Sequence, residues 1–373
     1  MIRPFLKHLW QRDSLTRWVS LFLVGVTLSL TIAACTGGGN TGTGGGTAGN
    51  SNAGSANGSS SAAKDVELTL VSFAVTRAAH EQIIPKFIEK WKQEHNQTVT
   101  FNQSYGGSGS QTRAVIDGLE ADVLHLALAL DTEKVEKAGL IEPGWENEAP
   151  NGAIVSKSVA ALVTREGNPK GVKDWADLTK EGVSVITANP KTSGGARWNF
   201  LALWGAITRT GGDEAKALEF TTNVFKNVPV LPKDAREASD VFFKQGQGDV
   251  LINYENEVIL AGLNGEKLPY VIPEVNISID NPIAVVDKNV DKHGTREVAE
   301  AFVQFLYTPE AQREFAKLGF RPVDATVGEE TANKFTKLKT LFTAQDLGGW
   351  DAIQKQFFDD GAVFDKVQAD TKK

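Results

Sequence analysis

At 373 residues the chain is long enough for two domains of ordinary size, since domains usually contain roughly 100–200 residues. Hydrophobic residues make up 41% and charged residues 23%, which is ordinary for a soluble globular protein, so a sizeable core can form. The formal net charge of −7 argues against a nucleic-acid partner, whose phosphates require a basic face.

The first 34 residues have the pattern of an export signal. Basic residues precede the apolar run WVSLFLVGVTLSLTIAA, which ends in small residues as a secretory signal peptide does. The next residue, Cys35, is the only cysteine, so no disulfide can form within the chain. The stretch IAAC resembles the bacterial lipobox, in which the cysteine is lipidated and becomes the mature N-terminus. We therefore expect a lipoprotein signal peptide at 1–34, because a free thiol is a liability in an oxidising compartment. The alternative is an ordinary cleavable signal with an incidental cysteine.

Residues 35–63 predict a flexible tether that follows the lipidated cysteine. The stretch TGGGNTGTGGGTAGNSNAGSANGSSSAA contains almost only Gly, Ser, Thr, Asn and Ala. Such a composition offers no apolar side chains to bury. A lipid anchor, a tether and a folded body are thus expected in that order.

The folded body begins with strands that alternate with helices. The run VELTLVSF predicts a strand, and the following helix carries Ile83, Ile84, Phe87, Ile88 and Trp91 at helical spacing. TVTFNQSY predicts a second strand, followed by a short helix, and ADVLHLAL predicts a third strand of the kind buried in a parallel sheet. This order predicts an α/β fold.

The same alternation restarts after the loop EPGWENEAPNGA and predicts a second α/β lobe. Strands are expected in SVAALVTR, GVSVITANP, NVPVL, GDVLINYENE and NPIAVVDK. Helices are expected in ARWNFLALWGAITRT, between NVPVL and GDVLINYENE, and in TREVAEAFVQFLYTPEAQREFAK.

Small residues mark four places where a strand passes into a helix, which is where ligands collect in open α/β sheets. They are SFAVTR around Ala74, SYGGSGSQ around Ser108, NPKTSGGARWN around Ser193, and PKDAREASDVFF with Asp234 as an N-cap. Helix N-termini carry unpaired N–H groups and about half a positive charge, so several that converge would hold an anion. Each loop alone is typical of a plain turn. Their joint presence favours an anion site.

Enzyme alternatives have weaker support. GGSG approaches the GxSxG nucleophile elbow, but among the downstream histidines only His293, in the polar turn DKHGT, has a plausible spacing for its triad. No GxxxxGK[ST] is present, and the histidines and acids show no metal-binding spacing. His125 lies in an apolar strand and is interpreted as a core residue. An exported serine hydrolase that uses Ser108 or Ser193 remains an alternative.

Three longer segments carry a family resemblance: SYGGSGSQTRAVIDGLEADVLHLALALD, GVSVITANPKTSGGARWNFLALWGA and GDVLINYENE. They resemble the periplasmic sulfate-binding proteins of ABC-type sulfate/thiosulfate importers, and the similarity covers most of the body. The resemblance implies a two-lobed periplasmic-binding-protein-like fold (type II) with a hinge. It places 64–157 and 281–373 in lobe I and 158–280 in lobe II, with crossings near Ser158 and Asn281 and with the lobe of the C-terminal segment left open.

The resemblance also implies a non-enzymatic function, with no cofactor and no metal. The protein would be an exported monomer that presents sulfate or thiosulfate to the permease subunits of an ABC transporter. Where the family has an indole donor this chain has Tyr254, and where it usually has Asp, contributing a backbone N–H, this chain has Ala74. The ligand-binding residues implied are Ala74, Ser108, Ser193, Gly194, Gly195, Ala235 and Tyr254.

These residue types suit sulfate, which is fully ionised at neutral pH and only accepts hydrogen bonds. A carboxylate facing it would be buried without a hydrogen bond, whereas phosphate carries a proton that an Asp can accept. Neutral donors therefore favour sulfate over phosphate, with phosphate, molybdate or another oxyanion as the alternative ligand. Arg197 and Arg236 are expected to stand behind the donor peptides and polarise them. The other interpretation is that both are solvated or paired on the surface.

Overall fold

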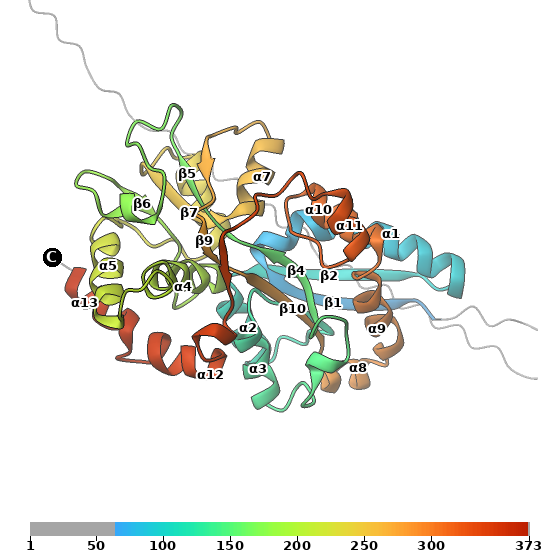
Figure 1. Ribbon diagram of the computed structural model, residues 1–373. Helices are drawn as coiled ribbons and strands as arrows, with labels where there is room; N and C mark the ends of the chain where they lie inside the picture. Colours follow the sequence, from blue (N-terminus) through green and yellow to red (C-terminus); the bar gives the residue numbers. More distant parts are fainter. Residues whose placement is uncertain (1–63, 372–373) are drawn as a thin grey trace, which may run out of the picture. The chain divides into compact units, whose positions relative to one another are not determined.

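Two β-sheets organise residues 64–371, the part of the chain that the computed structural model describes (Figure 1). The expected signal peptide at 1–34, Cys35 and the tether at 35–63 lie outside these residues. The first sheet has the order β2-β1-β3-β10-β4, in which β1 is parallel to β2 and β3, and β10 is antiparallel to β3 and β4. Its strands are β1 (Val66–Phe73), β2 (Val99–Gly106), β3 (Val123–His125), β4 (Ile154–Ser158) and β10 (Ile279–Val285).

Helices of the expected amphipathic type cover this sheet. In α1 (Arg77–His95) the buried side chains include Ile83, Ile84, Phe87 and Trp91, which repeat at helical spacing and pack toward the sheet. This half of the molecule also contains η1 (Ala74–Thr76), α1 (Arg77–His95), α2 (Ser108–Ile116), α3 (Ala129–Lys137), η2 (Trp145–Asn147), α8 (Asp287–His293), α9 (Arg296–Phe305), α10 (Pro309–Lys317) and α11 (Ala325–Glu330).

The second sheet has the order β6-β7-β5-β8. Its central strands are apolar and buried along their length, because helices cover them. The strands are β5 (Ala160–Thr164), β6 (Val185–Ile186), β7 (Val250–Tyr254) and β8 (Tyr270–Val271). The helices of this half are η3 (Trp175–Thr179), α4 (Gly194–Thr208), α5 (Glu214–Lys226), α6 (Ala235–Phe243) and α7 (Glu255–Leu263). The two α/β lobes expected from the sequence are therefore present.

The chain passes between the sheets at two short crossings. β4 ends at Ser158 in the first sheet, and β5 begins at Ala160 in the second. The return follows β9 (Val275–Ile277), and β10 starts at Ile279, two residues before Asn281. The amide of Asn281 accepts from Ser156 Oγ at 3.2 Å and donates to the Ala127 carbonyl at 2.9 Å, which fixes the second crossing against the first sheet.

The C-terminal segment, whose lobe the sequence left open, packs against strand and helix elements of the second lobe. β11 (Thr340–Phe342) pairs with β9, and the aromatic rings of Phe357 and Phe364 pack edge-on against Phe200 of α4. Figure 1 shows the red segment beside α4 and α5. This segment contains η4 (Gln345–Leu347), α12 (Trp350–Ile353), η5 (Gln354–Phe358) and α13 (Val363–Thr371).

Two expectations about local structure are wrong. NVPVL, residues 227–231, is not a strand: Pro229 lacks an N–H for a ladder, and Val230 is exposed. The long helix expected at 295–317 is two helices, because Thr308 caps a new helix that begins at Pro309. Between residues 64 and 371, no helix is both long and apolar enough to span a bilayer.

Candidate anion-binding site

A small cavity lies where the expected junctions of the two lobes meet. All seven ligand-binding residues expected from the sequence line it, so the structure brings them together. The complete lining consists of Phe73, Ala74, Val75, Gly106, Gly107, Ser108, Ala127, Ser193, Gly194, Gly195, Asp234, Ala235 and Tyr254.

The N-terminus of α2 contributes a peptide donor from the first lobe. Ser108 is buried, and its hydroxyl donates to Asp131 Oδ2 at 2.7 Å and accepts from the Ala127 N–H at 3.0 Å. The side chain is therefore occupied within the protein. The Ser108 N–H has no partner among the described residues, as expected for the first turn of a helix. Ser108 thus faces the cavity with a backbone donor, while its hydroxyl orients the loop.

The N-terminus of α4 contributes both hydroxyl and peptide donors from the second lobe. Ser193 caps this helix by accepting from the Ala196 N–H at 3.2 Å, and its hydroxyl hydrogen has no acceptor within 64–371. The N–H groups of Gly194 and Gly195 are likewise unpaired among the described residues. One hydroxyl and two peptides are therefore available at this helix end.

Glycine is required in these loops because the two lobes approach closely. A Cβ atom on Gly107 would lie 2.6 Å from the Thr192 carbonyl oxygen. A Cβ on Gly194 would lie 2.7 Å from the Ala127 Cβ, across the interface between the lobes. A real Cβ atom essentially never comes within 3.0 Å of another heavy atom in this way. Glycine at these positions therefore permits the lobes to close on one another.

The N-terminus of α6 supplies the Ala235 peptide. Asp234 caps this helix, as expected, by accepting from the Glu237 N–H at 2.9 Å, and Ala235 N–H has no partner among the described residues. The arrangement repeats that at Ser193: a capping side chain holds the helix end, and the first peptide behind it stays free.

Tyr254 ends β7 and closes one wall of the cavity. Its phenol is buried, and the hydroxyl has no hydrogen-bond partner within the described part of the chain. A Cβ on Gly195 would lie 2.9 Å from that hydroxyl oxygen, which places the phenol against the α4 N-terminus. Burial raises the pKa of the Tyr254 phenol well above its usual range, and the Glu257 and Asp131 carboxylates raise it further. The hydroxyl is therefore protonated and able to donate.

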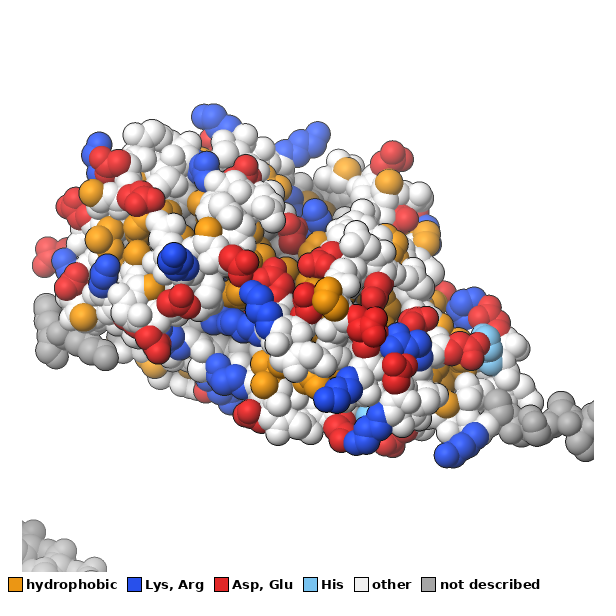
Figure 2. All heavy atoms as spheres, turned by 90° about the horizontal axis from the view of Figure 1, so that it is seen from below, with side chains coloured by type: hydrophobic (Ala, Val, Ile, Leu, Met, Phe, Trp, Pro, Cys, Tyr) orange, Lys and Arg blue, Asp and Glu red, His pale blue; other side chains and the backbone are white. Residues whose placement is uncertain are grey.

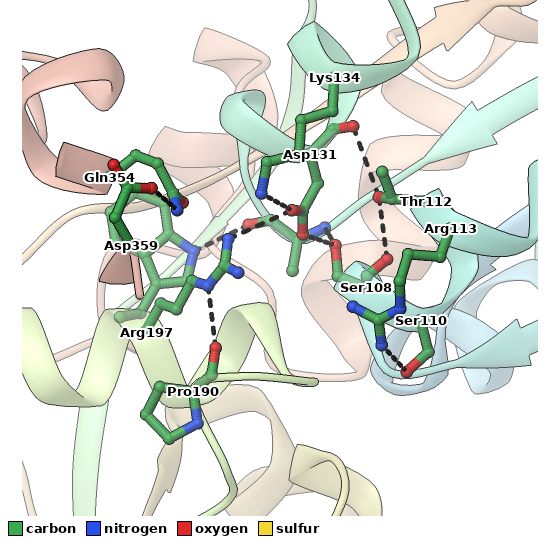
Figure 3. Close-up of polar contacts among 12 residues, drawn as sticks. Ser108, Ser110, Thr112, Arg113, Asp131, Lys134, Pro190, Arg197, Gln354 and Asp359 are labelled. Carbon is green, nitrogen blue, oxygen red and sulfur yellow. Dashed lines mark hydrogen bonds and ion pairs between the residues drawn. The ribbon is translucent and has the colours of Figure 1, made fainter. Parts of the chain in front are cut away.

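The two arginines lie behind the cavity and do not line it. Arg197 is buried, donates from Nε to the Pro190 carbonyl at 3.0 Å, and pairs through Nη1 with Asp131 Oδ1 at 3.3 Å (Figure 3). Arg236 forms a two-point pair with Glu257 at 2.9 and 2.7 Å. Both are bonded to protein groups, so neither is free in solvent.

Asp131 was missed in the sequence although it connects Ser108 to Arg197 (Figure 3). It is fully buried in the first turn of α3. The available signal was a single acid directly after the apolar run LALAL, since an acid there must find a partner. Its partners lie 23 and 66 residues away along the chain, which the sequence alone does not reveal.

The residues around Ser108 and Ser193 do not form a hydrolase triad. Ser108 bonds to an aspartate, and His293 pairs with Asp122 and Glu120 at 2.8 and 3.0 Å. His125 is buried as expected, with one ring nitrogen bonded to His80 and the other unpaired among the described residues. Burial lowers the pKa of His80 to about 3, so it stays neutral. Within 64–371, no group of three His, Cys, Asp or Glu side chains is placed to hold a metal ion.

The chain is similar to several known proteins. Residues 68–321 match the family described as bacterial extracellular solute-binding protein. The chain is 59% identical to the sulfate-binding protein of Synechococcus elongatus, over 97% of this chain and 98% of that protein. It is 39% identical to the thiosulfate-binding protein of Pseudomonas aeruginosa, over 80% of this chain and 90% of that protein. The solved structure of the sulfate-binding protein SubI from Mycobacterium tuberculosis has a TM-score of 0.73 and 37% identity, over 79% of this chain and 100% of that one.

Proposed function

The chain belongs to the bacterial extracellular solute-binding proteins, and on this basis we propose that it captures sulfate, or thiosulfate, and delivers it to an ABC transporter. The role is binding without catalysis, as the names of its relatives indicate. Sulfate is the first choice because the relative with 59% identity is named for sulfate, while the thiosulfate-binding relative is 39% identical.

One observation supports this proposal most directly: the cavity presents neutral donors that lack partners, while the carboxylate in its lining, that of Asp234, caps α6. Peptide N–H groups of Ser108, Gly194, Gly195 and Ala235, and the hydroxyls of Ser193 and Tyr254, have no acceptor among the described residues. A tetrahedral dianion offers only acceptor oxygens, so it would satisfy these donors together. The helix N-termini add a favourable field for the negative charge.

We propose that Arg197 and Arg236 act through the peptides and carboxylates that they contact, not on the ligand itself. Arg197 bonds to the Pro190 carbonyl, in the loop that leads to Ser193. A cation at that carbonyl polarises the chain of peptides toward the cavity. The anion would then be stabilised without a direct ion pair.

Capture would occur by closure of the two lobes at the crossings after Ser158 and before Ile279. We assign 64–157 and most of 281–339 to lobe I, and 160–277 with the C-terminal segment to lobe II. A ligand that bonds to both lobes has a higher affinity for the closed form and shifts the equilibrium toward it.

The protein would act outside the cytoplasm, attached to a membrane through a lipid on Cys35 and extended by the tether at 35–63. Its partners would be the ligand and the permease subunits, and it would work as a monomer. A nucleic-acid partner is disfavoured by the acidic balance of the chain. On the face in Figure 2 acidic and basic side chains are intermingled, which is unlike a continuous basic surface.

Isothermal titration calorimetry of the purified mature protein in detergent tests the proposal. Sulfate is expected to bind in a one-to-one complex, and thiosulfate is then added in competition to rank the two anions. Phosphate binding that is tighter than sulfate binding, or no response to either sulfur oxyanion, would contradict it.

A further inference from the structure

Tyr254 differs chemically from the indole that the resemblance places at this position. An indole N–H can only donate a hydrogen bond, whereas a phenol hydroxyl donates one and also accepts. The hydroxyl of Tyr254 is buried and lines the cavity, and it has no partner among the described residues. Its capacity to accept is therefore unused by the protein.

Each of the other polar side chains that line the cavity already accepts one hydrogen bond from a backbone N–H. Ser108 Oγ accepts from the Ala127 N–H, and Ser193 Oγ accepts from the Ala196 N–H. Asp234 accepts from the Glu237 N–H as the cap of α6. Among these side chains, the phenol of Tyr254 alone has no donor bonded to it within 64–371.

We infer that Tyr254 is a specificity-determining residue that allows the site to accept a protonated tetrahedral oxyanion, such as hydrogen phosphate, as a second and weaker ligand. A protonated oxyanion brings one hydroxyl donor into the cavity. In a site built from donors alone, that proton would face another donor and stay unpaired, which is costly in a dry cavity. The phenol oxygen of Tyr254 can accept it.

The inference rests on the proposed function, because it requires an anion in the same cavity. It also sharpens that function. A donor-only site excludes every oxyanion that keeps a proton at neutral pH, whereas this site would rank sulfate first and still bind hydrogen phosphate. Selectivity for sulfate would then depend on the larger number of donors that it satisfies and would be finite.

Calorimetry of the mature protein with sulfate, selenate and inorganic phosphate at neutral pH tests the inference. Selenate controls for size and charge, because it is a tetrahedral dianion without a proton. For the natural chain we expect measurable phosphate binding that is weaker than sulfate binding. Tyr254→Phe removes the acceptor, so phosphate affinity should fall at least about tenfold more than sulfate and selenate affinity.

Tyr270→Phe is the matched control, because it removes the hydroxyl of an exposed tyrosine that does not line the cavity. It should leave the ratio of phosphate to sulfate affinity within about twofold of the natural value, by the scatter expected for a conservative change. A ratio unchanged by Tyr254→Phe, or lowered equally by Tyr270→Phe, overturns the role of Tyr254.

The outcomes separate the inference from the proposed function. If sulfate and selenate bind but phosphate does not, the inference fails and the proposed function stands. If none of the three anions binds, the proposed function fails as well. Thermal unfolding of each variant verifies that the chain is folded, and selenate binding by Tyr254→Phe verifies that its cavity is intact.

Discussion

The Arg197 guanidinium lies 3.3 Å from the Asp131 carboxylate, and this ion pair joins α4 of the second lobe to α3 of the first. Both side chains are buried, with 7% and 0% of their surfaces exposed. A buried pair contributes little when compared with apolar packing, but breaking it leaves an uncompensated charge. The pair therefore links the closed arrangement of the lobes to the arrangement of the cavity residues.

Replacing Asp131 by Asn should weaken the closed form by about 3 kcal/mol, because Arg197 then loses its buried counter-charge. Sulfate affinity should fall more than the stability of the ligand-free protein, since the pair spans the two lobes. Urea unfolding with and without saturating sulfate measures both quantities. Lys244→Ala is the control, because it removes an exposed pair with Asp240 and should change stability by less than about 0.5 kcal/mol. Equal losses in both states would contradict a role in closure.

Gly107→Ala should impair closure without unfolding the protein. The added Cβ would lie 2.6 Å from the Thr192 carbonyl oxygen when the lobes are closed, and overpacking of this kind costs about 1–3 kcal/mol. The dissociation constant for sulfate should rise accordingly. Gly106→Ala is the matched control, because its nearest contact would be an ordinary 3.6 Å from Gln111. If both variants bind sulfate with the affinity of the natural chain, the close approach at Gly107 is not needed for binding.

Ser193→Ala should mainly lower the affinity for sulfate, whereas Ser108→Ala should mainly lower the free energy of unfolding. Ser193 carries a hydroxyl hydrogen without an acceptor in the described chain, so its removal should cost sulfate affinity by about 1 kcal/mol or more, together with the loss of a helix cap. The Ser108 hydroxyl donates to Asp131 and accepts from the Ala127 N–H, so its removal should mainly lower the free energy of unfolding. Calorimetry and urea unfolding of the two variants separate these effects. Loss of affinity at Ser108 alone would show that its hydroxyl reaches the ligand.

His293 should make stability depend on pH. Hydrogen bonds that His293 donates to the carboxylates of Glu120 and then Asp122 raise the pKa of His293, and Lys292 also pairs with Glu120. A raised pKa in the folded state means that the stabilisation is complete below about pH 6.5, the pKa in the unfolded chain, and is lost as pH rises through the folded-state value. Thermal unfolding of the natural chain and His293→Gln across this range should converge at high pH. A difference in melting temperature that stays constant with pH would refute the assignment.

Cys35→Ser should release the protein from membranes in a bacterial host that processes lipoproteins, because the serine cannot carry the thioether-linked lipid. A single acyl chain binds membranes only marginally, so the expected anchor depends on the complete lipid at this residue. Fractionation of cells, with incorporation of labelled fatty acid, measures the change. A natural protein that is found in the soluble fraction without label on Cys35 would favour the alternative of an ordinary cleavable signal with an incidental cysteine.

The positions of the cavity residues could be predicted because their signals are local. Glycine, serine and capping residues follow directly after apolar strands, and the carboxyl ends of those strands meet in space. Asp131 and the C-terminal segment could not be predicted in the same way. The partner of Phe357 is Phe200, and that of Asp131 is Arg197, so each depends on how distant elements dock. The sequence around a buried acid or an aromatic side chain does not indicate which distant residue it will contact.

The indole of Trp198 gives the molecule an optical reporter of its own state. Its Nε1–H donates to the Ala127 carbonyl across the lobes at 2.8 Å, and its ring meets that of Trp350 edge-on with centroids 4.7 Å apart. Parting of the lobes would break that bond and admit water to a side chain that is now 1% exposed. Intrinsic tryptophan emission should therefore shift to shorter wavelength as the ligand binds, so that occupancy can be followed in solution without any label.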